Sequence, residues 1–144
     1  MKRLSLALVA HDAKKEDMVR LVEAHKEVLS GLELTATRST GRLIGERTGL
    51  KVRLLESGSM GGDQQVGALV ANEAIKAVIF LRDPLAAHPH EPDVSALLRV
   101  CDVHNVPLAT NLTTAEAVLR LIFEHPEALG ANQAASYIEK MTTA

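Results

Sequence analysis

Residues 76–82 have the sequence KAVIFLR, in which five consecutive apolar residues lie between two cations. A short, uninterrupted apolar run is typical of a strand that is buried on both faces, as in a parallel sheet. We therefore expect a central strand here. Five residues are far too few to span a bilayer.

Short apolar runs and helical patterns alternate on both sides of this strand. This alternation predicts βαβ units and an α/β fold. We expect one domain over residues 1–144, a Rossmann-like three-layer α/β/α sandwich with a five-stranded, mainly parallel sheet. The predicted strands are 3–10, 33–37, 51–56, 76–82 and 106–110, and the predicted helices include 13–30, 40–48, 113–124 and 131–141, with another beginning at about residue 63.

Composition excludes several classes of protein. The chain has 144 residues, 47% of them hydrophobic and 24% charged, with a formal net charge of −2. A near-neutral chain has no field that gathers nucleic acid or an anionic membrane. Only Phe80, Phe123 and Tyr137 are aromatic, which argues against a base-stacking platform. We expect neither a nucleic-acid nor a membrane partner.

The single cysteine, Cys101, excludes an intramolecular disulfide and a cysteine-based zinc site. It fits a reducing compartment, so we expect a soluble, cytoplasmic protein. Residues 4–10 follow Met1-Lys2-Arg3 and faintly resemble the apolar region of a signal peptide. His11 and Asp12 follow where a small-residue cleavage site is expected, which argues against that interpretation.

Polar clusters follow each predicted strand. In open α/β sheets, ligands bind outside the carboxyl ends of the strands. If the strand assignment is right, these clusters share one edge of one sheet and form one site. They are residues 11–12, 37–40, 57–63, 83–93 and 110–111.

Two of these clusters have the composition of a phosphate cradle. Residues 57–62 (SGSMGG) and residues 37–41 (TRSTG) each join a strand to a helix, and glycines, hydroxyls and helix N–H groups favour anions. Lys15, one turn into the first helix, adds a cation for a phosphate. The alternatives are ordinary turns and helix caps, with Asp63 as a first-turn acid and Lys15 on a solvated face.

Residues 83–93 (DPLAAHPHEPD) contain three prolines, which stiffen the segment. One interpretation is a rigid loop followed by a capped helix that begins near Pro92. A second is a metal site formed by His88, His90 and Asp93. A third is acid–base chemistry, because histidine exchanges protons near neutral pH and a carboxylate three residues on can orient it.

Several segments resemble the methylglyoxal synthase family, over about residues 4–124. They are Ala10-His11-Asp12, GSMGGDQQVGAL at 58–69, Asp83-Pro84-Leu85, PHEPDV at 89–94 and Ala109-Thr110-Asn111. The resemblance implies a Rossmann-like fold, a homohexamer, and a lyase that forms methylglyoxal and inorganic phosphate from dihydroxyacetone phosphate. It also implies no cofactor and no metal, with phosphate as an inhibitor.

The resemblance also assigns roles to individual residues. Asp63 is the expected general base, His90 polarises the substrate oxygens, and Asp93, Asp12 and Asp83 support the hydrogen-bond network. The phosphate and substrate ligands that it implies are His11, Lys15, Thr37, Ser39, Thr40, Ser57 and Gly58. Arg38 departs from the family pattern, which has a glycine near this position, and either crowds the cradle or adds a phosphate contact.

Two other functions share parts of this pattern. Regulatory domains of carbamoyl phosphate synthetase belong to the same superfamily and sense phosphorylated ligands without catalysis. Such a domain has no need of Asp63, His90 and Asp93 together. A phosphosugar isomerase shares the first proton transfer but retains the phosphate ester, so its products differ from those of the lyase.

Overall fold

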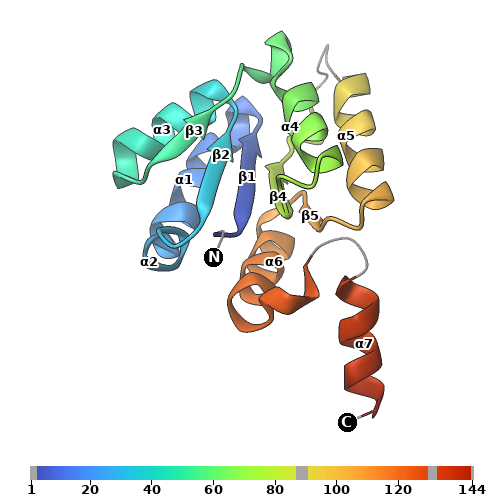
Figure 1. The fold of residues 1–144 in the computed structure, drawn as a ribbon. Coiled ribbons are helices and arrows are strands. Elements are labelled where there is room, and N and C mark those ends of the chain that lie inside the picture. Colours follow the sequence, from blue (N-terminus) through green and yellow to red (C-terminus); the bar gives the residue numbers. More distant parts are fainter. Residues whose placement is uncertain (1–2, 87–90, 130–132, 144) are drawn as a thin grey trace.

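The computed structural model describes residues 3–86, 91–129 and 133–143. Its centre is a five-stranded sheet with the strand order β3-β2-β1-β4-β5, and all four strand pairs are parallel (Figure 1). The strands are β1 (Ser5–Ala10), β2 (Glu33–Ala36), β3 (Val52–Leu54), β4 (Ala77–Leu81) and β5 (Leu108–Ala109). The predicted α/β class and parallel sheet are confirmed.

Helices cover both faces of the sheet and complete three layers (Figure 1). Alternate residues of β1 point to opposite faces, as the period of two requires. Leu6 and Leu8 pack in one core with α1, α3 and α6, whereas Ala7 and Val9 pack in the other with α4 and α5. The helices are α1 (Lys15–Ala24), α2 (Lys26–Leu29), α3 (Arg38–Thr48), α4 (Gly62–Ala71), α5 (Glu91–Val103), α6 (Leu112–Glu124) and α7 (Gln133–Thr143).

The strand predicted at 76–82 is β4, and all five of its residues are buried. It lies between β1 and β5, away from the edges of the sheet. The two edge strands are shorter than predicted: β3 and β5 keep only the central residues of 51–56 and 106–110. An edge strand pairs on one side only, so fewer of its residues are held in the ladder.

The helix predicted over 13–30 is divided. A 3₁₀ turn at Asp12–Lys14 precedes α1, and His25 separates α1 from α2 with non-helical backbone angles. The His25 Nε2 atom lies 2.8 Å from Oε1 of Glu116 on α6. This contact stabilises the interruption between α1 and α2. Because Glu116 is distant in the sequence, the local hydrophobic periodicity does not predict the interruption.

Other helix boundaries shift by small amounts. Helix α3 begins at Arg38, two residues before the predicted start, and ends as expected at Gly49, whose φ of 75° favours glycine. Helix α5 begins at Glu91, so Pro92 lies in its first turn, where proline is tolerated. No helix among the described residues is long and apolar enough to cross a membrane.

Candidate active site

A cavity of about 510 Å³ lies at the carboxyl ends of β1, β2 and β4. It contains most of the predicted site residues, which come from four of the five predicted polar clusters and from the start of α1. Those lining it are His11, Asp12, Lys15, Thr37, Ser39, Ser57, Gly58, Asp63 and Asp83. The expectation that the polar strand ends share one site is therefore met for these residues.

Asp63 is the second residue of α4 and its side chain is 1% exposed. The chain reaches this position through Gly61, whose φ is 100°, and Gly62. A Cβ atom on Gly62 would lie 2.1 Å from the Glu56 carbonyl oxygen and 2.8 Å from Cγ2 of Thr37. Glycine is therefore required at 62 for the start of α4 to approach β2 closely, which brings Asp63 beside the polar strand ends.

The Gln65 side chain stabilises the loop between β3 and α4 by a hydrogen bond. Its Oε1 atom accepts a hydrogen bond of 2.7 Å from the Glu56 backbone N–H, directly before Ser57. The Gly62 N–H donates to the Ser57 carbonyl at 2.8 Å. Two contacts thus hold Ser57 and Gly58 against the helix that carries Asp63.

Thr37 and Ser57 occupy cap positions, but neither side chain makes a capping hydrogen bond. Among the described residues, their hydroxyls and that of Ser39 make no hydrogen bond. Thr37 is nevertheless buried, with 4% of its surface exposed. Hydroxyls at a helix N-terminus that do not cap the helix remain available to an anion. This arrangement favours a phosphate cradle over ordinary caps.

Lys15 brings a cation to the same cavity. Its Nζ atom forms an ion pair with Oδ1 of Asp12, on the 3₁₀ turn that precedes α1. The Lys15 side chain is largely buried, whereas that of Asp12 is exposed. Asp12 therefore fixes the ammonium where a phosphate would pair with it.

His11 is buried directly after β1 and contacts the ring of Phe80 edge-on, with centroids 5.1 Å apart. Its Nδ1 atom accepts a 2.9 Å hydrogen bond from the Asp83 backbone N–H. An accepting Nδ1 carries no proton, so the neutral ring has its proton on Nε2. His11 is thus a neutral donor that also fixes the start of the loop after β4.

The comparisons with known proteins agree with this geometry. A family model described as the MGS-like domain matches residues 17–110. Methylglyoxal synthase from Moorella thermoacetica is 59% identical over 123 residues, which cover 85% of this chain and 96% of that protein. Methylglyoxal synthase from Bacillus subtilis is 54% identical over 121 residues, 84% of this chain and 88% of that protein.

The solved structures extend this similarity to three dimensions. The crystal structure of methylglyoxal synthase from Elizabethkingia anophelis NUHP1 matches with a TM-score of 0.77 and 47% identity, covering 81% of this chain and 77% of that chain. This chain belongs to the methylglyoxal synthase family.

Two of the predicted phosphate ligands, Arg38 and Thr40, do not line the cavity. Arg38 lies in the first turn of α3, and its Nη2 atom is 3.3 Å from Oε1 of Glu56. Thr40 is 2% exposed, and its Oγ1 atom has no hydrogen-bond partner among the described residues. Because successive helical residues point about 100° apart, Ser39 reaches the cavity whereas its two neighbours do not.

The predicted acid–base pair of this synthase family is only partly described. Asp93, in the first turn of α5, does not line the cavity, and its Oδ1 atom accepts a 3.0 Å hydrogen bond from Nε2 of Gln64. His90, and His88 of the alternative metal site, lie outside the described residues. Within the described ranges, no group of three or more histidine, cysteine or acidic side chains is placed to hold a metal ion.

Sequence reasoning gave no role to several residues at the site. Gln64 and Gln65 lie in the family motif, but the sequence does not indicate that their side chains hold Asp93 and the Ser57 loop. Ser59 also lines the cavity, as its place in the predicted cluster 57–63 implies, although the resemblance assigns it no role. Phe80 lines the cavity as well, and only its position near the end of β4 indicates this.

Proposed function

We propose that this protein converts dihydroxyacetone phosphate to methylglyoxal and inorganic phosphate. One observation carries the proposal: a carboxylate that is 1% exposed, Asp63, lines the same cavity as Lys15 and the uncapped hydroxyls of Thr37 and Ser57. A base and a phosphate cradle thus share one space of a size that suits a small metabolite.

Asp63 takes a proton from C3 of the substrate in the first step. The electrons of the C3–H bond form the C2–C3 double bond, and the carbonyl oxygen gains the negative charge of an enediolate. A buried carboxylate is a better base than one in water, because burial disfavours its charged form. Donors near the carbonyl oxygen stabilise the developing charge, and His11, whose neutral ring keeps a proton on Nε2, supplies one.

Phosphate leaves in the second step. A proton first passes from the C3 hydroxyl to the C2 oxygen, the transfer that the family resemblance assigns to His90. The C3 oxygen then forms the aldehyde carbonyl, the C2–C3 double-bond electrons form a C1–C2 double bond, and the C1–O bond to phosphate breaks. The resulting enol takes a proton on C1 and releases the proton of the C2 oxygen to give methylglyoxal.

Elimination requires the C1–O bond to phosphate to lie perpendicular to the enediolate plane. The hydroxyls of Thr37, Ser39 and Ser57, with Lys15, hold the phosphate group and set this angle. The reaction is that of a carbon–oxygen lyase acting on a phosphate ester.

The cradle implies product inhibition. Inorganic phosphate carries the same oxygens as the substrate's phosphate group, so we propose that it competes for the same hydroxyls and for Lys15.

We also propose that the chain acts in the cytoplasm as a homohexamer. Exposed apolar side chains on α7, Ile138 at 61% and Met141 at 63%, support association between copies.

An end-point assay tests the lyase. Purified protein is incubated with dihydroxyacetone phosphate, and methylglyoxal and released phosphate are both quantified. We expect equal amounts of the two products from the natural sequence. Asp63→Asn keeps the volume of the side chain and removes the base, so turnover should fall by about 10²- to 10⁴-fold. Asp102→Asn, an exposed position on α5, is the matched control.

Other outcomes separate the alternatives. Glyceraldehyde 3-phosphate without free phosphate would indicate an isomerase. Saturable binding of the substrate without any product would indicate a non-catalytic ligand-sensing domain. Undiminished turnover in Asp63→Asn would remove Asp63 as the base.

A further inference from the structure

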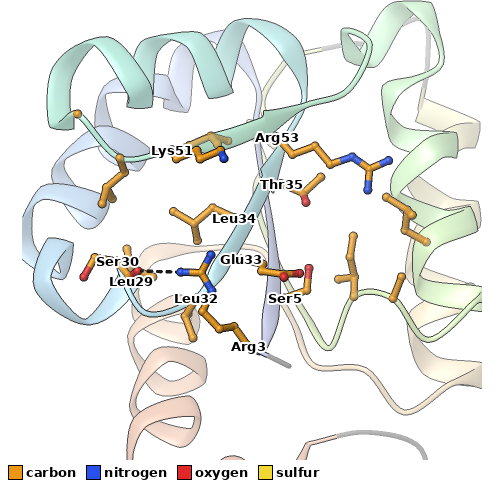
Figure 2. A pocket seen from close by; sticks show the side chains of 16 residues that line it. Arg3, Ser5, Leu29, Ser30, Leu32, Glu33, Leu34, Thr35, Lys51 and Arg53 are labelled. Atoms are coloured by element: carbon orange, nitrogen blue, oxygen red, sulfur yellow. Dashed lines mark hydrogen bonds between the residues drawn. The ribbon is translucent and has the colours of Figure 1, made fainter. Parts of the chain in front are cut away.

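A second cavity of about 510 Å³ lies on the sheet face formed by the beginnings of β1, β2 and β3 (Figure 2). It shares no lining residue with the cavity at the carboxyl ends of the strands. Helix α4 borders it through Leu69, and the segment after α4 borders it through Ile75. Nothing in the proposed reaction uses this space.

Two largely buried residues with hydroxyl side chains line this sheet-face cavity. Thr35 is 4% exposed and Ser5 is 8% exposed. Neither side chain makes a hydrogen bond to any other described residue. Both side chains line the cavity, so their hydroxyls are open to a hydrogen-bonding ligand that enters it.

Cationic side chains surround these hydroxyls. Arg53 is paired in register with Thr35, and Lys51, directly before β3, lines the same cavity. Figure 2 shows Arg53 extending from β3 past Thr35 toward α4. Neither cation forms an ion pair within the part of the chain that the structure describes.

The remaining charges leave the cavity positive. Arg3 lies at its lower end and donates a 3.4 Å hydrogen bond to the Ser30 carbonyl. Among the described residues, Glu33 is the one acidic side chain that lines it. Three cations against one carboxylate favour a ligand with two negative charges. Leu69 and Ile75 form an apolar wall, which favours a ligand with an apolar part as well.

We propose that the sheet-face cavity binds a phosphate monoester of a small apolar alcohol. Arg53 and Lys51 pair with the phosphate oxygens, the Thr35 and Ser5 hydroxyls donate to them, and the apolar group packs against Leu69 and Ile75. Arginine suits this role because its planar guanidinium donates two parallel hydrogen bonds to a phosphate. The ligand and the substrate bind at the same time, since the two cavities are separate.

Isothermal titration with phenyl phosphate tests the proposal by counting sites. The probe combines a dianion with an apolar ring and also fits the phosphate cradle of the active site. We expect two molecules per chain for the natural sequence. Arg53→Gln should retain one, Lys15→Gln should retain the other, and the double variant should retain none. Arg42→Gln, an exposed arginine on α3 that lines neither cavity, is the matched control and should retain both.

The nature of the ligand is tested with two further probes. Benzoate keeps the ring but carries one charge, and phenol keeps the ring without any charge, so binding at the Arg53-dependent site should weaken in that order. Thr35→Val removes the hydroxyl at nearly constant volume and should weaken phenyl phosphate at this site by about tenfold. Activity toward dihydroxyacetone phosphate in this variant reports that it has folded.

The proposal is overturned if Arg53→Gln leaves the phenyl phosphate isotherm unchanged, whether the natural sequence binds one molecule or none. An unchanged isotherm is also the result expected if a second copy of the chain covers the sheet-face cavity, and in that case too the cavity binds no phosphate monoester. Failure here is distinct from failure of the proposed lyase, because loss of the Arg53-dependent site leaves the product assay unaffected.

Discussion

The backbone N–H of Asp83 donates a 2.9 Å hydrogen bond to Nδ1 of His11, and this bond joins the end of β1 to the segment after β4. The His11 N–H in turn donates to the Leu81 carbonyl at 3.1 Å. Two hydrogen bonds thus join the ends of β1 and β4 next to the cavity. The bond has a second consequence, because it decides which ring nitrogen of His11 carries the proton.

We expect the neutral ring of His11 to carry its proton on Nε2 at neutral pH. Long-range ¹H–¹⁵N correlation spectra of protein labelled at histidine would report this tautomer. His125 provides an internal comparison, because its Nδ1 atom lies 3.3 Å from Oε1 of Glu127 and should carry a proton. A proton on Nδ1 of His11 would contradict the hydrogen bond from Asp83.

Near the candidate active site, Gly62 is the glycine at which an added side chain should lower stability and activity most. In Gly62→Ala the new Cβ meets backbone atoms of Glu56 and Ser57, which cannot turn aside as a flexible side chain would. Overpacking of this kind costs about 1–3 kcal/mol of unfolding free energy, and activity should fall because Asp63 and Ser57 shift apart. Denaturant unfolding and the product assay measure the two effects.

Gly67 is the matched control for that experiment. It lies on the same helix, and a Cβ there would meet only Cδ1 of Leu97 at 4.0 Å. Gly67→Ala should stabilise the protein by about 0.5–1 kcal/mol, because alanine favours the helix. Equal effects of the two substitutions would show that helix propensity, and not the close approach at Gly62, is responsible.

Cys101 should be chemically inert in the folded protein. Burial raises the pKa of its thiol from 9.0 to about 11, and the charge of Asp102 adds to the effect. At pH 8 only about one molecule in a thousand then carries the thiolate. Iodoacetamide should therefore label the thiol only after unfolding, and rapid labelling of the native protein would contradict its burial.

The raised thiol pKa also predicts a pH dependence of stability. The folded-state pKa lies above the unfolded value, so the contribution of Cys101 is complete below pH 9 and is lost as the pH rises toward 11. Unfolding free energy should fall over that range. Cys101→Ala should remove this component of the slope, whatever it does to stability at neutral pH. An identical slope in the variant would assign the pH dependence to other groups.

The architecture and most of the site could be predicted because they depend on simple periodicities. Parallel strands place their carboxyl ends at one edge, so His11, Thr37, Ser57 and Asp83 come together once the strands are recognised. Arg38 and Thr40 show where this reasoning stops. The sequence pattern predicts a loop over residues 37–40, whereas α3 already begins at Arg38 and turns neighbouring side chains in different directions.

Other features depend on contacts that no local pattern contains. The break at His25 is held by Glu116, 91 residues away in the sequence. The sheet-face cavity arises because Arg53 and Thr35 become neighbours only when β2 and β3 pair. Alternation along each strand indicates which residues share a face, but it does not indicate that α4 leaves part of that face open.

Gln64 and Gln65 are adjacent on α4, yet their substitution should affect different kinetic constants. Gln65 accepts from the Glu56 N–H and holds the loop of Ser57 and Gly58. Gln65→Leu should therefore loosen the phosphate cradle and raise KM for dihydroxyacetone phosphate by about 2- to 10-fold, the effect of one ordinary hydrogen bond. Gln64 donates to Asp93, so Gln64→Leu should lower kcat and leave KM nearly unchanged. Initial rates of phosphate release measure both constants. Equal changes of KM and kcat in the two variants would contradict this prediction. They would show that Gln65 does not act on phosphate binding alone and that Gln64 does not act on catalysis alone.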